Sequence, residues 1–420
     1  MYRVEIAKIA SQLLPRLVAL VCLLGPLAFT IFISTQSTVP SDSLFGRWVH
    51  TSGFAIPFVV LQFANTLGFP LIASVVAGDI FASEDRQSTW KTILTRSCSR
   101  RDIFWGKTWA AFTYSIAMVV LVAASSLIAG VVVVGAGQVI GLSGAPIGPG
   151  RTIALIVESF AIALAPTIAF TCVGIFFSVT SRNSVVGILG PLVTGLVMLL
   201  LSLLGSGVVV RSVLLPTAVE AWHGLQIPGS SATPLWLGLV VSAAWMVLSL
   251  DAARRSFQRR DFAGDGQVPV SWSRLERGVF VGVGVTALLV VGSFLDRTWI
   301  TSKHVESSVG ATFRNLVVAQ QGLLGRELDP DSVQVYPFCK RESVVSGPSR
   351  GSGDDWTCTL YANGPRLSQL AVGYTVAIRP NGCYTADGPP EVIGPLHIRK
   401  AGGATAINPL FAFDGCMIAP

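Results

Sequence analysis

Charged residues are scarce in this sequence. Asp, Glu, Lys and Arg together make up 13% of its 420 residues, whereas about 25% is usual for a soluble domain. Hydrophobic residues make up 51%. A chain with so little charge has too few polar side chains to cover a soluble globule of this size. The composition therefore excludes an ordinary soluble protein and predicts a membrane protein.

Histidines and familiar catalytic motifs are also scarce. HExxH and GxSxG do not occur, and the histidines are widely separated: His50, His223, His304 and His397. The apolar segments contain no paired acids and no nucleophile with a matching base. We therefore expect this chain to be no enzyme, to hold no metal and to bind no cofactor.

Long apolar runs are abundant, and each is about the 20 residues that a helix needs to cross a bilayer. We predict seven membrane-spanning helices: Leu17–Thr35, Ser52–Ala77, Trp109–Val134, Thr152–Thr180, Ser184–Leu204, Pro234–Ala253 and Gly278–Leu295. The predicted fold class is an α-helical polytopic membrane protein. Residues 1–14, before the first span, suit a helix that lies at the membrane surface.

The basic residues lie in alternate loops. They precede the first span, fill the loop after the second and fill the loop after the sixth, while the other loops have few. Positive charge marks the cytoplasmic side, so we predict a cytoplasmic N-terminus. The net charge of +7 is therefore explained by the basic loops that orient the chain in the membrane, and it does not indicate binding of nucleic acid. The excess of arginine over lysine is typical of a GC-rich bacterial genome, which predicts a bacterial cytoplasmic membrane.

Residues 296–420 form a polar region that follows the seventh span, and the odd number of spans places it outside the cytoplasm. It holds Cys339, Cys358, Cys383 and Cys416. An even number of cysteines in an oxidising compartment predicts two disulfides, with three pairings open. We favour Cys339–Cys358 and Cys383–Cys416. The alternative is a zinc site, but this region has no Cys-x-x-Cys pair to support one.

The same region has mixed secondary-structure patterns. Val305–Leu324 repeats apolar residues at helical spacing, and three later segments alternate as strands do: Val333–Phe338, Trp356–Tyr361 and Leu370–Ile378. Pro380-Asn381-Gly382 suits a hairpin turn before Cys383. We predict a small α+β domain with one helix packed on an antiparallel sheet.

The loop after the second span contains Gly106-Lys107-Thr108, the end of a phosphate-binding motif. The position that needs the first glycine holds Arg101, so we expect no nucleotide here. A short helix, capped by Ser88 or Thr89, would run through Trp90 and Leu94 with one apolar face. Such a helix suits docking to a partner; alternatively, the charges of the loop only set the topology.

The run AGDIFASEDRQSTWKTILTRSCSRRDIFWGKTWAA, with Phe257-Gln258-Arg259-Arg260-Asp261 at the end of span six, resembles ABC-2-type transporter permeases. The resemblance covers roughly residues 1–261. Ser88 and Cys98 stand where that family commonly has glycine and proline. The chain also departs from the family in its basic linker (262–277), its seventh span (278–295) and its external domain (296–420).

The resemblance implies a six-helix permease that pairs with a second permease copy and with separate ABC ATPase subunits, which bind ATP and Mg. The chain would export an amphipathic or hydrophobic substrate and contact membrane lipid but no nucleic acid. The resemblance assigns the ATPase-coupling loop to Glu84, Thr89, Trp90, Lys91, Leu94, Arg96, Arg100 and Lys107. An alternative function is a membrane-anchored sensor or scaffold whose external domain binds a ligand or partner.

Three polar residues inside predicted spans are candidates for a translocation path: Glu158, Gln62 and Asn65. Ionisable groups in a bilayer are costly and generally face the protein interior. Alternatively, Glu158 is hydrogen-bonded across a helix interface or lies close enough to the surface to be hydrated.

Overall fold

The computed structural model describes residues 1–36, 45–95, 99–203, 213–226, 233–260, 262, 300–342, 348–364, 367–379, 382–403 and 405–417. In this part of the chain, six helices are long and apolar enough to cross a membrane. They coincide with the first six predicted spans and indicate a multi-pass membrane protein. The predicted seventh span, Gly278–Leu295, and the linker before it lie outside the described residues.

The chain starts with the short helix α1 (Tyr2–Ser11), and extended Gln12 separates it from α2 (Leu13–Thr35). The second span is built from η2 (Gly53–Ala55), α3 (Ile56–Phe63), the π-turn η3 (Ala64–Gly68) and α4 (Phe69–Asp79). The remaining long helices are α7 (Arg100–Val133), α8 (Pro149–Ser181), α9 (Ser184–Leu203) and α12 (Thr233–Arg259).

The helix α7 begins earlier than the sequence predicted, at Arg100 rather than Trp109. Ser99 explains the difference, because its side chain accepts a hydrogen bond from the backbone N–H of Asp102 while the Asp102 carboxylate accepts one from the backbone N–H of Ser99. This capping box starts the helix within the charged loop. Lys107 therefore lies within the first turns of α7 and not in the loop before it.

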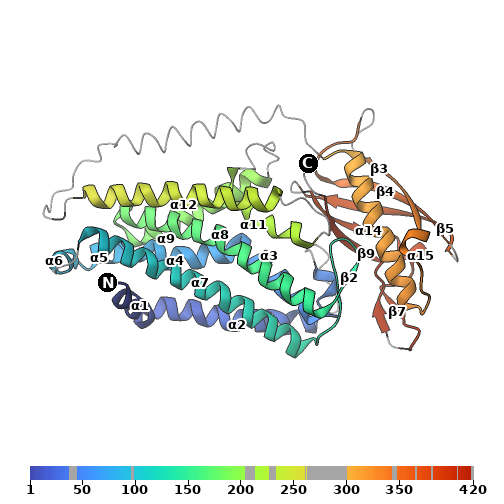
Figure 1. Cartoon of the computed structure of the whole chain (residues 1–420), viewed down its shortest axis with the longest axis horizontal. Helices are drawn as coiled ribbons and strands as arrows, with labels where there is room; N and C mark the ends of the chain where they lie inside the picture. Colours follow the sequence, from blue (N-terminus) through green and yellow to red (C-terminus); the bar gives the residue numbers. More distant parts are fainter. Residues whose placement is uncertain are drawn as a thin grey trace.

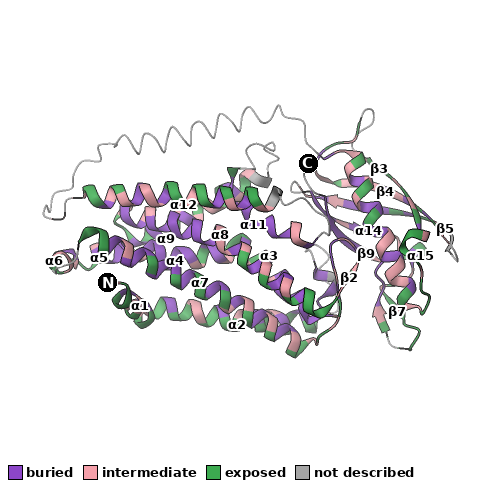
Figure 2. Ribbon diagram, in the orientation of Figure 1, coloured by how far each residue is buried: buried purple, intermediate pink, exposed green. Residues whose placement is uncertain are grey.

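The long helices run side by side in one bundle (Figure 1). The second span and α8 bury more than half of their residues, whereas α2, α9 and α12 bury less than a quarter (Figure 2). Close packing of α4 on α9 depends on glycine, because a Cβ on Gly187 would lie 2.1 Å from the carbonyl oxygen of Gly78. Small residues at such crossings are typical of membrane helices. The exposed sides of α2, α9 and α12 suit lipid or another membrane subunit.

Shorter elements connect these helices. They are η1 (Gly46–Trp48), α5 (Ala82–Arg86), α6 (Trp90–Leu94), the β1–β2 hairpin (Val139–Ile140 and Pro146–Ile147), α11 (Leu215–Val219) and η4 (Ala221–Gln226). The helices α5 and α6 lie at the end of the bundle that holds α1, and the β1–β2 hairpin lies at the opposite end (Figure 1).

The C-terminal domain packs one long helix, α14 (Ser302–Leu323), on a five-stranded antiparallel sheet of order β3-β4-β5-β6-β9. The strands are β3 (Gln334–Arg341), β4 (Gly353–Gly364), β5 (Leu367–Ile378), β6 (Cys383–Asp387) and β9 (Ala412–Cys416). Smaller elements are η5 (Pro330–Ser332), α15 (Pro390–Ile393), β7 (His397–Arg399) and β8 (Thr405–Ile407). The predicted α+β architecture is therefore confirmed.

The predicted apolar stripe of α14 forms the core of this domain. Val305, Val309 and Phe313 are fully buried, and Phe313 packs edge-on against Tyr374 of β5. β5 and β6 pair as the predicted hairpin requires, although Pro380 and Asn381 lie outside the described residues.

Both predicted disulfides are confirmed. Cys339 and Cys358 face each other across β3 and β4, and Cys383 and Cys416 face each other across β6 and β9. Disulfides persist in oxidising compartments, so they fit an extracytoplasmic location for this domain.

The C-terminal domain contacts the end of the bundle that holds the β1–β2 hairpin (Figure 1). The Asp414 carboxylate accepts a hydrogen bond from the backbone N–H of Phe45 at 3.1 Å, and the Asn315 amide donates to the carbonyl of Ser143 at 2.7 Å. Between these contacts, Gly144 has a φ of +77° and approaches α14 closely. A Cβ there would lie 2.5 Å from the carbonyl oxygen of Thr312.

We expect Gly144→Val to loosen this contact, because left-handed φ costs about 1 to 2 kcal/mol for a residue with a Cβ, before any clash is counted. The yield of a disulfide engineered between Ser143→Cys and Asn315→Cys should fall about tenfold in this variant. Gly148→Val is the matched control, because Gly148 has ordinary extended backbone and a Cβ added there would meet no atom within 4 Å. Equal yields in both variants would contradict the packing of Gly144 on α14.

Candidate functional site

The loop between α4 and α7 carries the two short helices α5 and α6 at the α1 end of the bundle (Figure 1). Ser88 turns the chain between them with a left-handed φ of 54°. Side chains of α5 and α6 reach α1, α7 and the end of α12, and these contacts fall into two groups. One group is a buried set of charges, and the other is a cluster of aromatic rings.

The charge network is centred on Lys107, whose side chain is completely buried. Its Nζ lies 2.8 Å from Oε1 of Glu84 and 3.0 Å from Oε1 of Glu5. The ammonium of Lys8 also donates to Oε1 of Glu84, at 2.5 Å, and the hydroxyl of Thr89 donates to Oε2. Two positive and two negative charges thus neutralise one another, which is what burial of an ammonium requires.

The electrostatics of Glu84 follow from this arrangement. Burial alone would raise the pKa of its carboxyl group, but the charge of Lys107 and hydrogen bonds from Lys107, Lys8 and Thr89 lower the pKa from 4.5 to about 2. Glu84 therefore stays ionised at neutral pH. A single carboxylate joins the N-terminal helix α1, the α5–α6 loop and α7.

The aromatic cluster lies on the other side of the loop and is centred on Trp90. The Trp90 ring packs against Phe257 at 5.5 Å and Phe262 at 5.1 Å, between ring centroids. The Arg260 guanidinium lies over Trp90 and Phe262 and pairs with the carboxylate of Asp85. A guanidinium over aromatic faces, paired with a carboxylate, is a specific arrangement that lysine does not reproduce.

Arg100 adds a second connection between α7 and the end of α12. Its Nη1 donates to the carbonyl oxygens of Gln258 at 3.0 Å and Arg260 at 2.9 Å, and its guanidinium lies over Phe262. These carbonyls are at the C-terminus of α12, where a cation also favours the helix dipole. The tail that contributes to the ABC-2 resemblance, Phe257 to Asp261, therefore packs on the loop, although Asp261 itself lies outside the described residues.

The structure places the eight residues predicted for the loop in different settings. Glu84, Thr89 and Lys107 belong to the charge network, and Trp90 and Arg100 belong to the aromatic cluster. Lys91 is exposed and Leu94 half-buried, while Arg96 lies outside the described residues. The roles of Glu5, Lys8, Asp85 and Arg260 were not predicted, because the partners of these residues are far away in the sequence.

Two details of the predicted loop helix are corrected. Thr89 precedes α6 but makes no capping hydrogen bond to it, because its hydroxyl bonds to Glu84 instead. The apolar face of α6 does not point to a partner, since Trp90 is only 5% exposed and packs inside the protein. The exposed residues described in this loop are all polar: Arg86, Gln87, Ser88, Lys91, Thr92, Thr95 and Ser99.

Gly106-Lys107-Thr108 lies within the helix α7, and all three residues are buried. A phosphate-binding loop needs free backbone N–H groups that wrap the phosphates, and helical residues beyond the first turn lack them. Gly106 has another purpose here, because a Cβ would lie 2.7 Å from the Cβ of Met1. This glycine lets the start of α1 pack against α7.

The polar residues proposed for a translocation path have separate partners. Glu158 pairs with Arg151 at 2.9 Å in the first third of α8, and the exposed fractions of the Arg151 and Glu158 side chains are 57% and 42%. Asn65 is buried in the π-turn and donates to the carbonyl of Val219, at the end of α11, at 3.1 Å. Gln62 is half-buried, and its Oε1 has no hydrogen-bond partner within the described ranges. Their assignment to a path stays a prediction.

A family model described as "Protein of unknown function (DUF2705)" matches residues 18–263. This chain belongs to the DUF2705 family. The match covers the six long helices and the α5–α6 loop and ends before the C-terminal domain of this DUF2705 protein. No curated protein matches the sequence. Among the residues described, no three His, Cys, Asp or Glu side chains come together as metal ligands would.

We expect Glu84→Gln to lower the melting temperature of the purified protein strongly, because removing one partner of a buried ion pair costs about 3 to 5 kcal/mol. Glu158→Gln is the matched control, since an exposed pair contributes only about 0 to 1 kcal/mol. Equal shifts in the two variants would contradict the central place of the Glu84 network.

The same network predicts a pH dependence. The pKa of Glu84 is lower in the folded protein than the ordinary value of 4.5, so its stabilising effect is complete above pH 4.5 and is lost as the pH falls towards 2. Over this range the melting temperature of the wild-type protein should fall more than that of Glu84→Gln. Parallel curves would show that Glu84 does not titrate with a lowered pKa.

Proposed function

We propose that this chain is the permease subunit of an ATP-driven exporter of the ABC-2 type, and that its α5–α6 loop receives a separate ATPase. The observation that carries this proposal is the way the loop is held. The loop connects two spans and is bound to other helices on both sides. Glu84 attaches it to α1 and α7, and Asp85 and Trp90 attach it to the end of α12.

Such an attachment suits a loop that transmits movement. A force applied to a flexible loop dissipates in the loop itself, whereas packed side chains and ion pairs carry a displacement to the elements they join. Here the joined elements are the start of the chain, the third long helix of the bundle and the last one described. A push on α6 would therefore reach helices on both sides of the bundle.

The exposed residues of the loop supply a docking surface. Lys91, Thr92 and Thr95 are exposed on or beside α6, and Arg101 is exposed at the start of α7. This surface is polar and basic, so an ATPase partner would meet it with acidic and hydrogen-bonding groups. The chain has no Walker motif, and ATP and Mg would be bound by the partner.

Several features of the proposal concern the assembly. The positive charge of this end supports a cytoplasmic location for the loop, in a bacterial cell. Two copies of the permease would pair in the membrane and enclose the path of an amphipathic or hydrophobic substrate. The poorly buried faces of α2, α9 and α12 leave room for this pairing.

A sensor or scaffold is the second candidate function, and one observation favours it. The C-terminal domain is bound to the far end of the bundle through Asp414 and Asn315, so a ligand on that domain would act on the membrane helices directly. In that case the α5–α6 loop would dock a different intracellular partner.

Affinity purification of the tagged chain from its native membranes, followed by mass spectrometry, separates these functions. We expect a stoichiometric ATPase with Walker motifs to co-purify. Lys91→Glu should reduce its recovery at least about tenfold, because reversing a charge at a polar interface replaces an attraction by a repulsion. The melting temperature should not change, since Lys91 is exposed.

Lys340→Glu is the matched control, because Lys340 is also exposed but lies in the C-terminal domain. It should leave the recovery of the ATPase unchanged. Reproducible absence of any ATPase, with another intracellular protein in its place, would contradict the exporter and favour the scaffold.

A further inference from the structure

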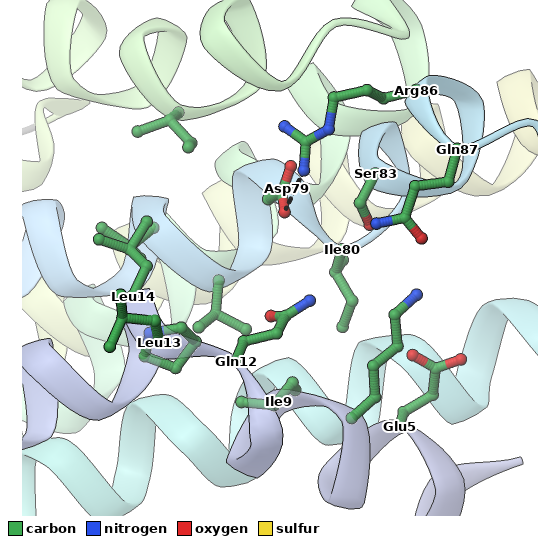
Figure 3. A pocket seen from close by; sticks show the side chains of 15 residues that line it. Glu5, Ile9, Gln12, Leu13, Leu14, Asp79, Ile80, Ser83, Arg86 and Gln87 are labelled. Atoms are coloured by element: carbon green, nitrogen blue, oxygen red, sulfur yellow. Dashed lines mark ion pairs between the residues drawn. The ribbon is translucent and has the colours of Figure 1, made fainter.

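A cavity of about 350 Å³ opens between α1, the start of α2, the end of α4 with α5, and α9 (Figure 3). Its wall is divided by polarity. Leu13 and Leu14 lie together at one side, and Arg86, Gln87 and Glu5 lie at the other (Figure 3). Val75, Val76 and Ile188 add to the apolar part.

The cavity lies where the apolar helix α2 meets the charged helices α1 and α5, which suits the boundary of a bilayer. The apolar side is formed where the apolar helix α2 begins, and Leu13 there is 72% exposed. The polar side is formed by the charged helices α1 and α5. A molecule with a polar head and an apolar tail would fit this cavity in the same orientation that it has in a membrane leaflet.

Most of the charges in the wall are already neutralised. Glu5 is bound to Lys107, and Lys8 is bound to Glu84. The pair of Asp79 and Arg86 is different. Its closest N–O distance is 3.6 Å, which is too long for a hydrogen bond, and the Arg86 side chain is 59% exposed.

Asp79 also has an unused acceptor. Its Oδ1 is buried, with no hydrogen-bond partner in the part of the chain that the structure describes. A buried carboxylate oxygen without a donor is costly, so the site favours a ligand that brings one. Arg86, which is loosely held, is free to turn toward an anionic group on the same ligand.

We infer that this cavity binds the headgroup of a membrane phospholipid that carries a primary ammonium beside its phosphate, as in phosphatidylethanolamine. The ammonium donates hydrogen bonds to the Asp79 carboxylate, whose side chain is 21% exposed, and the phosphate accepts from the guanidinium of Arg86. The acyl chains leave along Leu13, Leu14 and Ile188. A quaternary ammonium has no N–H group and cannot satisfy Asp79, so phosphatidylcholine is a poor ligand.

This inference does not depend on the proposed function. A lipid headgroup can bind here whether the chain is a permease or a scaffold, and an ATPase can dock on Lys91 whether or not the cavity is filled. The two proposals therefore fail separately.

Native mass spectrometry of the full chain in detergent, titrated with single lipids, tests the inference. We expect phosphatidylethanolamine to bind at least about tenfold more tightly than phosphatidylcholine or phosphatidylglycerol, because a hydrogen bond to a charged group contributes about 1.5 to 3 kcal/mol. Asp79→Asn should abolish this preference. Equal binding of the three lipids to the wild-type protein, or an unchanged preference in Asp79→Asn, would overturn the inference.

Two further measurements guard against a misfolded variant and a different source of the ligand. Ile188→Trp should fill the apolar side and weaken phosphatidylethanolamine binding, whereas Val185→Trp, exposed on the same helix outside the cavity, should not. Equal effects of both substitutions would contradict the site. Free phosphoethanolamine should bind far more weakly than the lipid, and equal affinities would rule out a membrane source.

Discussion

The ammonium group of Lys107 is buried completely, and the N-terminal end of the bundle is arranged around it. An ammonium inside a protein is tolerated only with compensating carboxylates. Glu84 and Glu5 supply them, one from the α5–α6 loop and one from α1. Because Glu84 also binds Lys8, the position of each of these elements depends on the others. Electrostatic pairing thus fixes a loop that would otherwise be one of the most mobile parts of a membrane protein.

The aromatic cluster extends this constraint to the last described helix of the bundle. Trp90 fills the space between the loop and the end of α12, and Arg260 is held between aromatic faces and Asp85. The combination makes the loop stiff while its outer surface stays polar. We regard the rigid packing of the loop against the helices, together with its polar exposed surface, as the physical basis for the proposed docking of an ATPase. At the other end of the bundle, hydrogen bonds of Asp414 and Asn315 attach the C-terminal domain.

Much of this architecture could be predicted from the sequence, because its signals are local. Apolar length predicted the six long helices, and the alternation of residues predicted β3, β4 and β5, whereas β9 was not predicted. The even number of cysteines predicted two disulfides, and the favoured one of three pairings is the one that forms. The capping box at Ser99 and Asp102 was also local but was not used, so the start of α7 was placed too late. The π-turn at Ala64–Gly68 has no clear signal in the apolar run that contains it.

The candidate site could be predicted only in part, because its contacts join distant residues. Glu84 and Lys107 were selected as members of one loop, but nothing in their spacing indicates that Glu5 and Lys8 complete their charges. Asp85 and Arg260 are 175 positions apart and meet only in the folded chain. The apolar face of Trp90 and Leu94 was interpreted as a docking face, because the pattern of a single helix does not indicate which neighbour covers it. The division of the cavity beside Asp79 into polar and apolar sides also arises only from the fold.

Hydrogen–deuterium exchange on purified wild-type protein and Lys107→Met tests the central claim most directly. Methionine fills a similar volume without the charge, which leaves Glu5 unpaired and Glu84 bound to Lys8 alone. The account predicts faster exchange in α1 and in residues 82–94 of the variant, with α8 unchanged. Identical exchange in these segments would contradict the claim that Lys107 holds the loop in place.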